Sequence, residues 1–237
     1  MTTRQTLAIL FAQPPLPGRV KTRLVPPLTP EEAALLSEAF LLDTLDNLAL
    51  LDGVDLWVAY PSIPGAREHM ARVLPPGTVE MAADGVDLEQ RLEAGFERGF
   101  AAGYRAVLAV SSDSPLLPVE SLRRAVERLR RRDAVIGPCV DGGYYLIGLT
   151  RPAPTLFRAL PWTRPALFGA TTHRLDELAM AWETLPAAFD VDVPPDLIRL
   201  VTTWRKEPDR VPARTSRLLA EWLADRLERR APDGERP

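Results

Sequence analysis

The sequence predicts a single α/β domain in which a mostly parallel, mixed sheet is flanked by helices. Short apolar runs such as Leu7–Ala12 and Ala106–Val110 lack polar alternation, which is typical of strands buried on both faces. Longer segments of helical periodicity separate these runs, so the chain repeats a strand-then-helix unit. A chain of 237 residues that is 46% hydrophobic can bury one such core, and it contains no linker long enough to divide it.

The first elements are signalled by local motifs. After the strand at 7–12, Thr29-Pro30-Glu31-Glu32 forms a capping box with proline at the first helical position, which predicts a helix to about Leu50. Val54–Tyr60 reads as the second strand, ended by proline, and a short helix at 66–73 and a weak strand at 78–82 follow. We expect the long helix to bury the stripe Leu35, Ala39, Leu42 and Leu45–Leu48.

The middle of the chain continues the alternation. Asp87 begins a helix in which Leu88, Leu92 and Phe96 recur every fourth residue, and Gly103 ends it. The run Ala106–Val110 is the clearest strand in the sequence. The next helix starts at residue 118 or 119 and ends in an arginine cluster at 128–132, which we interpret as a solvated helix end rather than a nucleic-acid contact.

The last third is richer in proline. We expect strands at 134–138 and 144–149, a helix at 171–180, a strand at 182–185, a helix from 194 to about 204 and an amphipathic helix at 214–230. Residues 1–210 are expected to form the domain. Residues 211–237 add a C-terminal helix packed on it and a frayed tail.

Composition excludes several classes of function. A net charge of −3 and a pI near 5.6 give no electrostatic support for nucleic-acid binding. Cys139 is the single cysteine, so an internal disulfide is excluded, and with two histidines a structural zinc site is disfavoured; we interpret Cys139 as a buried small side chain rather than a nucleophile. No 18-residue apolar run or signal-peptide pattern is present, so we expect a cytoplasmic protein without a membrane span.

A cationic loop follows the first strand. Arg19, Lys21 and Arg23 lie within Gly18–Arg23, and Lys21 is one of only two lysines in the chain. Open α/β sheets bind anionic ligands at the carboxyl ends of their strands. Arginine binds phosphate in a bidentate manner, whereas lysine acts as a compact point charge. The loop therefore predicts a phosphate site, although a K-x-R motif taken alone is more often a solvated basic loop, so the prediction depends on the residues downstream.

Isolated carboxylates follow other strands. Asp113 comes directly after the strand at 106–110, and Asp190 and Asp192 alternate, so extended backbone would place them on one face. Carboxylates beside cations suit Mg²⁺ or Mn²⁺, which prefer oxygen ligands and phosphates. Asp113 can equally belong to a turn or cap, and Asp190, Asp192 or Asp196 can cap the helix that begins at residue 194.

Asp141-Gly142-Gly143 separates two predicted strands. The glycines would let backbone approach a ligand closely, and a plain hairpin turn explains them equally well. The sequence contains no Ser-His-Asp arrangement, G-x-S-x-G elbow or G-x-x-x-x-G-K-[ST] loop.

Taken in order, the motifs resemble a bacterial family of uncharacterised transferases with the glycosyltransferase-A, or nucleotide-diphospho-sugar transferase, fold. Wider relatives include 2-phospho-lactate guanylyltransferase and the molybdenum-cofactor guanylyltransferases. The motifs that carry the resemblance are P-G-R-V-K-T-R-L at 17–24, D-L-x-x-R at 87–91, S-D-S-P at 112–115, G-P-x-x-D-G-G-Y-Y-L-I-G at 137–148, P-W at 161–162 and D-V-D-x-P-x-D-L at 190–197.

The resemblance implies roles for individual residues. Asp113 would bind the metal, and Asp192 would be its second ligand, with Asp190 a weaker candidate. The implied nucleotide-binding residues are Gly18, Arg19, Lys21, Arg23 and Arg91, and the implied acceptor or sugar pocket is bordered by Asp141, Gly142 and Gly143. The expected ligands are a nucleoside triphosphate or a nucleotide-sugar, a small-molecule acceptor, and Mg²⁺ or Mn²⁺.

The sequence departs from the family pattern at two places. The glycine-rich G-x-G-x-x-x-R loop of sugar nucleotidyltransferases is replaced by the proline-rich segment Gln13–Pro17. The usual L-G-E-R appears as Leu88-Glu89-Gln90-Arg91, so Glu89 stands where the family has glycine.

Three functions are consistent with these residues. We favour nucleotidyl transfer to a phosphorylated acceptor, because residues 111–113 carry one carboxylate where glycosyltransferases of this fold commonly have a D-x-D pair. Glycosyl transfer from a nucleotide-sugar is the alternative. A catalytically silent nucleotide-binding domain is the third, and the joint presence of Lys21, Arg23, Asp113 and Asp192 speaks against it.

Overall fold

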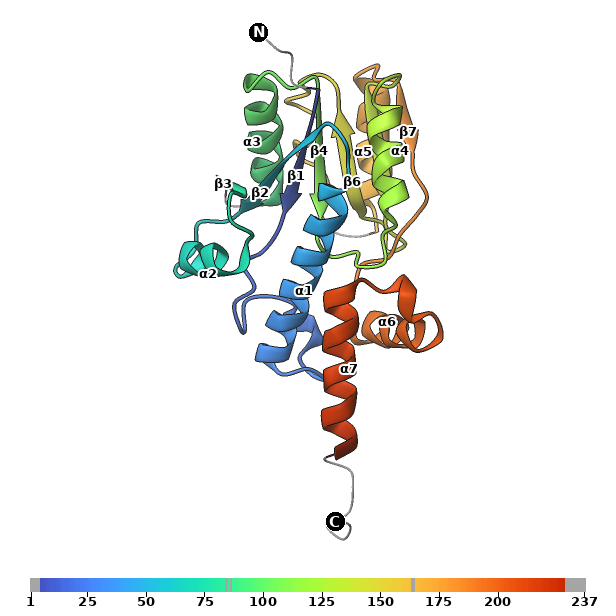
Figure 1. Cartoon of the computed structure of the whole chain (residues 1–237). Coiled ribbons are helices and arrows are strands. Elements are labelled where there is room, and N and C mark those ends of the chain that lie inside the picture. Colours follow the sequence, from blue (N-terminus) through green and yellow to red (C-terminus); the bar gives the residue numbers. More distant parts are fainter. Residues whose placement is uncertain (1–4, 84, 86, 163–164, 229–237) are drawn as a thin grey trace.

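A seven-stranded mixed sheet forms the centre of the molecule, with helices on both faces (Figure 1). This computed structural model describes residues 5–83, 85, 87–162 and 165–228. The strands are β1 (Thr6–Phe11), β2 (Val54–Tyr60), β3 (Val79–Ala82), β4 (Ala106–Ser111), β5 (Ala134–Pro138), β6 (Tyr144–Leu149) and β7 (Trp182–Thr184). The helices are α1 (Pro30–Ala49), α2 (Ala66–Val73), α3 (Leu88–Ala101), α4 (Val119–Arg128), α5 (Leu167–Glu177), α6 (Pro194–Lys206) and α7 (Ala213–Glu228), with short 3-10 turns at Thr22–Leu24 and Pro208–Arg210. The predicted α/β class is confirmed.

The strand order is β3-β2-β1-β4-β6-β5-β7. All neighbours pair in parallel except β6, which is antiparallel to β4 and to β5. Because β6 runs in reverse, its first residues lie beside the last residues of β4. The loops after β1 and β4 and the turn before β6 therefore reach the same edge of the sheet.

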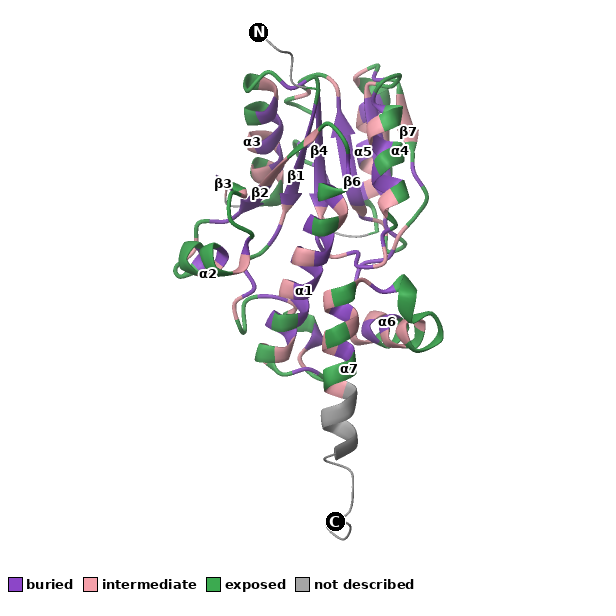
Figure 2. Cartoon of the chain, in the orientation of Figure 1, coloured by how far each residue is buried: buried purple, intermediate pink, exposed green. Residues whose placement is uncertain are grey.

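Two apolar clusters bind the helices to the sheet. On one face, α1 and α4 contribute buried leucines such as Leu45 and Leu122. On the other face, α3 and α5 contribute Phe96 and Leu175. Full burial of each such side chain stabilises the fold by about 2 kcal/mol, and Figure 2 shows these inward surfaces as buried.

A third cluster lies beyond the carboxyl ends of the strands. It joins Leu24 of the first loop, Phe40 of α1, Val191, Leu200 of α6 and Leu219 of α7. In Figure 1 the N-terminal half of α1 lies together with α6 and α7 at this end of the molecule. The cluster thus connects the loop after β1 to the segment that precedes α6.

The capping box of α1 forms as predicted. The hydroxyl of Thr29 accepts a hydrogen bond from the N–H of Glu32 (3.1 Å), and the Glu32 carboxylate accepts one from the N–H of Thr29 (2.8 Å). The buried stripe was predicted wrongly at Leu35, which is 49% exposed, whereas Leu36 is fully buried. The N-terminal half of α1 faces the third cluster rather than the sheet, and this partner was not visible in the periodicity.

Leu88, the first of the apolar residues that recur every fourth position in α3, is 45% exposed, because it stands at the first turn of the helix beside the pocket described below. One further prediction needs correction. Helix α5 begins at Leu167 rather than at residue 171. Ala166 at its N-cap makes no side-chain hydrogen bond, so the sequence carries no cap signal there.

Within the part of the chain that the structure describes, no helix is both long enough and apolar enough to cross a membrane.

Candidate functional site

A pocket of about 610 Å³ lies at the edge of the sheet where the loops after β1 and β4 meet the turn before β6. It is lined by the last residues of β1, β2 and β4 and, because β6 is reversed, by the first residues of β6. The residues selected from the sequence that line it are Arg19, Lys21, Arg23, Arg91, Asp113, Gly143 and Asp192.

Three charged groups from distant parts of the chain converge at this pocket. The Nζ of Lys21 lies 2.6 Å from Oδ1 of Asp113 and 3.0 Å from Oδ1 of Asp192. The Lys21 side chain is only 6% exposed, while those of Asp113 and Asp192 are 38% and 22% exposed. The carboxylates are therefore reachable from the pocket, whereas the Lys21 side chain between them is almost fully covered.

Backbone geometry holds the three groups together. Lys21 has φ 46°, in the left-handed region that costs a residue with a side chain roughly 1–3 kcal/mol and is often found at functional sites. The N–H of Val191 donates to the carbonyl of Asp113 (2.9 Å), which fastens the segment containing Asp192 beside the loop after β4. The ring of Phe40 lies with its centroid 5.8 Å from the Lys21 Nζ, so α1 supplies an aromatic face to the ammonium.

The capping alternatives can now be decided. The Asp196 carboxylate accepts hydrogen bonds from the N–H groups of Asp192 (3.1 Å) and Val193 (3.0 Å), so Asp196 provides the cap of α6. The Asp192 carboxylate instead accepts a hydrogen bond from Lys21. Asp113 precedes the start of α4 by several residues, and only its N–H takes part in the local turn, donating to the hydroxyl of Ser111 (3.1 Å).

The charge state of Lys21 follows from these contacts. Burial would lower the pKa of the Lys21 ammonium, but the Asp113 and Asp192 carboxylates outweigh burial through charge attraction and hydrogen bonding, and the net pKa is raised. Lys21 is therefore a full positive charge at neutral pH.

The arginines of the pocket have few protein partners. Arg19 and Arg23 are exposed and form no ion pair with any residue that the structure describes. The Nε of Arg91 donates to the carbonyl of Gly85 (3.3 Å), which holds its side chain at the start of α3. Gly18, with φ 72°, supplies the left-handed turn that begins the cationic loop, although it does not line the pocket.

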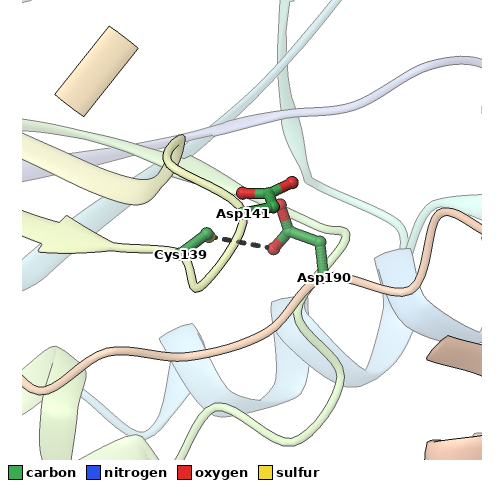
Figure 3. A group of neighbouring side chains, drawn as sticks. All are labelled: Cys139, Asp141 and Asp190. Carbon is green, nitrogen blue, oxygen red and sulfur yellow. Dashed lines mark hydrogen bonds between the residues drawn. The ribbon is translucent and has the colours of Figure 1, made fainter. Parts of the chain in front are cut away.

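Asp190 has different surroundings from Asp192. It is buried, and its carboxylate accepts hydrogen bonds from the hydroxyl of Ser114 and from the thiol of Cys139 (3.2 Å). Figure 3 shows Asp141 next to this pair, and one potential ligand atom from each of the three residues lies within 4.8 Å of the others. A thiolate in such a set favours a softer metal than Mg²⁺. Cys139 is buried, as expected.

The Asp141-Gly142-Gly143 turn connects β5 and β6, and the Asp141 carboxylate accepts a hydrogen bond from the N–H of Gly143 (3.1 Å). Gly142 has φ 92°, and a side chain there would begin 2.3 Å from the carbonyl oxygen of Pro165. Position 142 therefore requires glycine, because any side chain there would collide with the backbone of Pro165. Gly143 lines the pocket, whereas Asp141 and Gly142 do not.

Several residues that line the pocket had no role predicted from the sequence. Trp162 belongs to the P-W motif, and its indole N–H donates to the Glu89 carboxylate (3.1 Å), which also accepts from the N–H of Ala159 (3.2 Å). Glu89, the departure from the family glycine, therefore holds a pocket wall. Tyr144 also lines the pocket, and burial raises the pKa of its phenol. The pair Tyr144-Tyr145 directly after Gly143 is a sequence feature from which this pocket residue could have been predicted.

The donor set fits a hard divalent cation. Asp113 and Asp192 offer carboxylate oxygens at one point of the pocket. The neighbouring cationic side chains carry positive charge that complements the negative charge of a phosphate ligand.

Comparison with known proteins identifies the family and the fold of the chain. Residues 44–164 match the family described as "Uncharacterized protein conserved in bacteria (DUF2064)". The chain belongs to this family. A crystal structure described as a "putative nucleotide-diphospho-sugar transferase", from Desulfovibrio desulfuricans G20, is 33% identical, with a TM-score of 0.86 over 92% of this chain and 95% of that chain. The predicted family resemblance and fold are confirmed.

More distant structures share the fold of this DUF2064 chain. A CMP:2-keto-3-deoxy-manno-octonic acid synthetase in complex with CTP is 12% identical (TM-score 0.53, 86% of this chain and 99% of that chain). Rv0371c from Mycobacterium tuberculosis H37Rv, in complex with manganese, is 17% identical (TM-score 0.53, 84% and 98%). None of the curated proteins compared with the chain matches it.

Proposed function

We propose that the chain is a metal-dependent nucleotidyltransferase that joins the nucleotide of a nucleoside triphosphate to a small phosphorylated acceptor. One observation carries the proposal: the contact of Lys21 with both Asp113 and Asp192 in a pocket that arginines also line. Cations beside isolated carboxylates are what a metal–nucleotide complex requires. The transferases among the similar structures support the assignment to this enzyme class.

Each group has a distinct role. Asp113 and Asp192 would hold Mg²⁺ or Mn²⁺, which when bound neutralises charge on the phosphate oxygens. Arg19, Lys21 and Arg23 bind the phosphates, and Arg91, at the start of α3, faces the nucleotide. The acceptor lies toward the turn formed by Asp141, Gly142 and Gly143.

In the reaction, an acceptor phosphate oxygen attacks the α-phosphorus. The bond from that phosphorus to the oxygen bridging to the β-phosphate breaks, and pyrophosphate leaves with the electron pair. Lys21 and Arg23 stabilise the charge that accumulates on the pyrophosphate. Catalysis is then positioning and electrostatics without a protein nucleophile, and loss of one such group costs about 3 kcal/mol, or roughly a hundredfold in rate.

Glycosyl transfer from a nucleotide-sugar is the second candidate, and the name of the 33% identical structure favours it. Against it, the segment Ser111–Asp113 has a single carboxylate for the departing nucleoside diphosphate. A silent nucleotide-binding domain is the third candidate.

Thermal unfolding with each ribonucleoside triphosphate and a set of nucleotide-sugars, in Mg²⁺ or Mn²⁺, separates these functions. A ligand at 100 times its Kd adds about 2.7 kcal/mol, which raises the Tm of a chain of this size by roughly 5–10 °C. We expect a triphosphate to give this shift, and Asp113→Asn to remove it. Asp52→Asn, at an exposed carboxylate outside the pocket, is the matched control.

The identity of the released product distinguishes nucleotidyl transfer from glycosyl transfer. Release of pyrophosphate in the presence of a sugar phosphate or similar acceptor supports nucleotidyl transfer. A shift confined to nucleotide-sugars, with release of nucleoside diphosphate, would replace it with glycosyl transfer. Nucleotide binding that is indifferent to the metal and to Asp113→Asn would support the silent domain.

A further inference from the structure

The ammonium of Lys21 lies between the two carboxylates that the proposed function assigns to a metal ion. It is within 2.6 Å of Asp113 and 3.0 Å of Asp192, which are contact distances for a charge-assisted hydrogen bond. The chain thus carries its own cation at the position where the carboxylates converge.

A metal ion and this ammonium compete for the same oxygens. Two positive charges bound to the same carboxylates repel each other strongly, so a metal ion can bind well only if the ammonium moves. The Lys21 side chain is 6% exposed, and Asp113 and Asp192 are the carboxylates with which it pairs among the described residues. Without a phosphate ligand, an ammonium that moved away from the carboxylates would lose both ion pairs and form no new one.

A polyphosphate changes this balance. Arg19 and Arg23 line the same pocket and would hold phosphate groups close to Lys21. The oxygens of the phosphate chain then give the ammonium a new anionic partner, so that the carboxylates are released to the metal.

We propose that Lys21 makes metal binding depend on the phosphate ligand: its ammonium excludes a free cation from Asp113 and Asp192 and transfers to the polyphosphate when the metal and the phosphate arrive together. This inference rests on the proposed function and deepens it. The site then selects the metal–nucleotide complex over the free metal ion, and the two components bind cooperatively.

The test measures Mn²⁺ binding directly, by the loss of the electron paramagnetic resonance signal of free Mn²⁺, at neutral pH. The proteins are the wild type, Lys21→Met and Lys206→Met, the last being the same change at the other lysine of the chain, exposed at the end of α6. We expect Lys21→Met to bind one Mn²⁺ at least about tenfold more tightly than the wild type, which corresponds to about 1.4 kcal/mol. Lys206→Met should match the wild type.

The second arm adds inorganic pyrophosphate, corrected for the Mn²⁺–pyrophosphate complex that forms without protein. Pyrophosphate should tighten Mn²⁺ binding to the wild type by about tenfold or more and should do so much less for Lys21→Met. Combining Lys21→Met with Asp113→Asn should abolish the gain, which excludes binding at the Cys139, Asp141 and Asp190 group.

Lys21→Gln, which keeps a hydrogen-bonding group without the charge, guards against a folding defect in Lys21→Met. The wild-type comparison with and without pyrophosphate needs no variant at all. If the wild type binds free Mn²⁺ as tightly as both Lys21 variants and pyrophosphate adds nothing, the inference is wrong and the proposed function stands. If no protein binds Mn²⁺ in either arm, the inference and the metal dependence of the proposed function both fail.

Discussion

Replacement of Asp43 by alanine should destabilise the protein more than any change of comparable size at its surface. Asp43 lies on α1 with its side chain 3% exposed, and it caps the start of α7 from outside that helix. Its carboxylate accepts hydrogen bonds from the N–H groups of Arg214 (3.1 Å) and Thr215 (2.9 Å) and from the hydroxyl of Thr215 (2.7 Å). Alanine would leave all three donors without this acceptor.

The magnitude follows from these contacts. A hydrogen bond to a charged group contributes about 1.5–3 kcal/mol, and bonds that share one carboxylate are not additive, so the loss should be about 4 kcal/mol. That is a large part of a typical unfolding free energy of roughly 5–15 kcal/mol. Asp43→Asn keeps one acceptor oxygen and should lose about half as much.

Urea denaturation followed by circular dichroism measures both variants. Asp46→Ala is the control, because Asp46 pairs with the same Arg214 but its side chain is 60% exposed, and exposed ion pairs contribute about 0–1 kcal/mol. A loss below about 1 kcal/mol for Asp43→Ala, or equal losses at positions 43 and 46, would refute the reasoning.

Three other changes probe the pocket and the fold. Glu89→Ala should free the Trp162 indole, so that acrylamide quenches its fluorescence more strongly relative to a Trp162→Phe baseline; unchanged quenching would mean that the hydrogen bond does not hold the ring. Gly142→Ala should cost about 3 kcal/mol in denaturant titrations, against about 1 kcal/mol for Gly77→Ala, because both have positive φ (92° and 85°) but only Gly142 has backbone in the way. Burial raises the pKa of Tyr145 from 10.0 to about 12, so the stability it contributes in its neutral form should be complete below pH 10 and be lost as the pH rises through about 12. A difference titration of tyrosinate absorbance against Tyr145→Phe checks this value, and ionisation near pH 10 in the folded protein would contradict it.

Local signals in the sequence predicted the elements well where a side chain marks the boundary. The capping box at Thr29 and the prolines that end β2 and begin α6 place their elements to within a residue. The start of α5 was missed because its N-cap is an alanine. The exposure of Leu35 was missed because α1 packs against two different partners along its length.

Some features of the candidate site could likewise be predicted from the sequence, and others could not. Lys21, in a cationic loop after a strand, and Asp113, directly after another strand, were predicted from the residues, since the edge at which parallel strands end is fixed by the fold class. The preference for Asp192 over Asp190 came from the family resemblance, because the segment that contains both follows β7 by several residues. The separate surroundings of Asp190 depend on the thiol and hydroxyl that approach it, and no spacing rule carries that information. The wall formed by Trp162 depends on a contact with Glu89 across 73 positions of the chain.

The hydrogen bond between Lys21 and Asp192 spans 171 positions of the sequence. During synthesis on the ribosome, Lys21 is made early, and its partner Asp192 is made only after most of the polypeptide has emerged. Contacts of such long range form late in folding. A nascent or prematurely terminated chain, even one with an intact sheet, would therefore lack the assembled charge cluster.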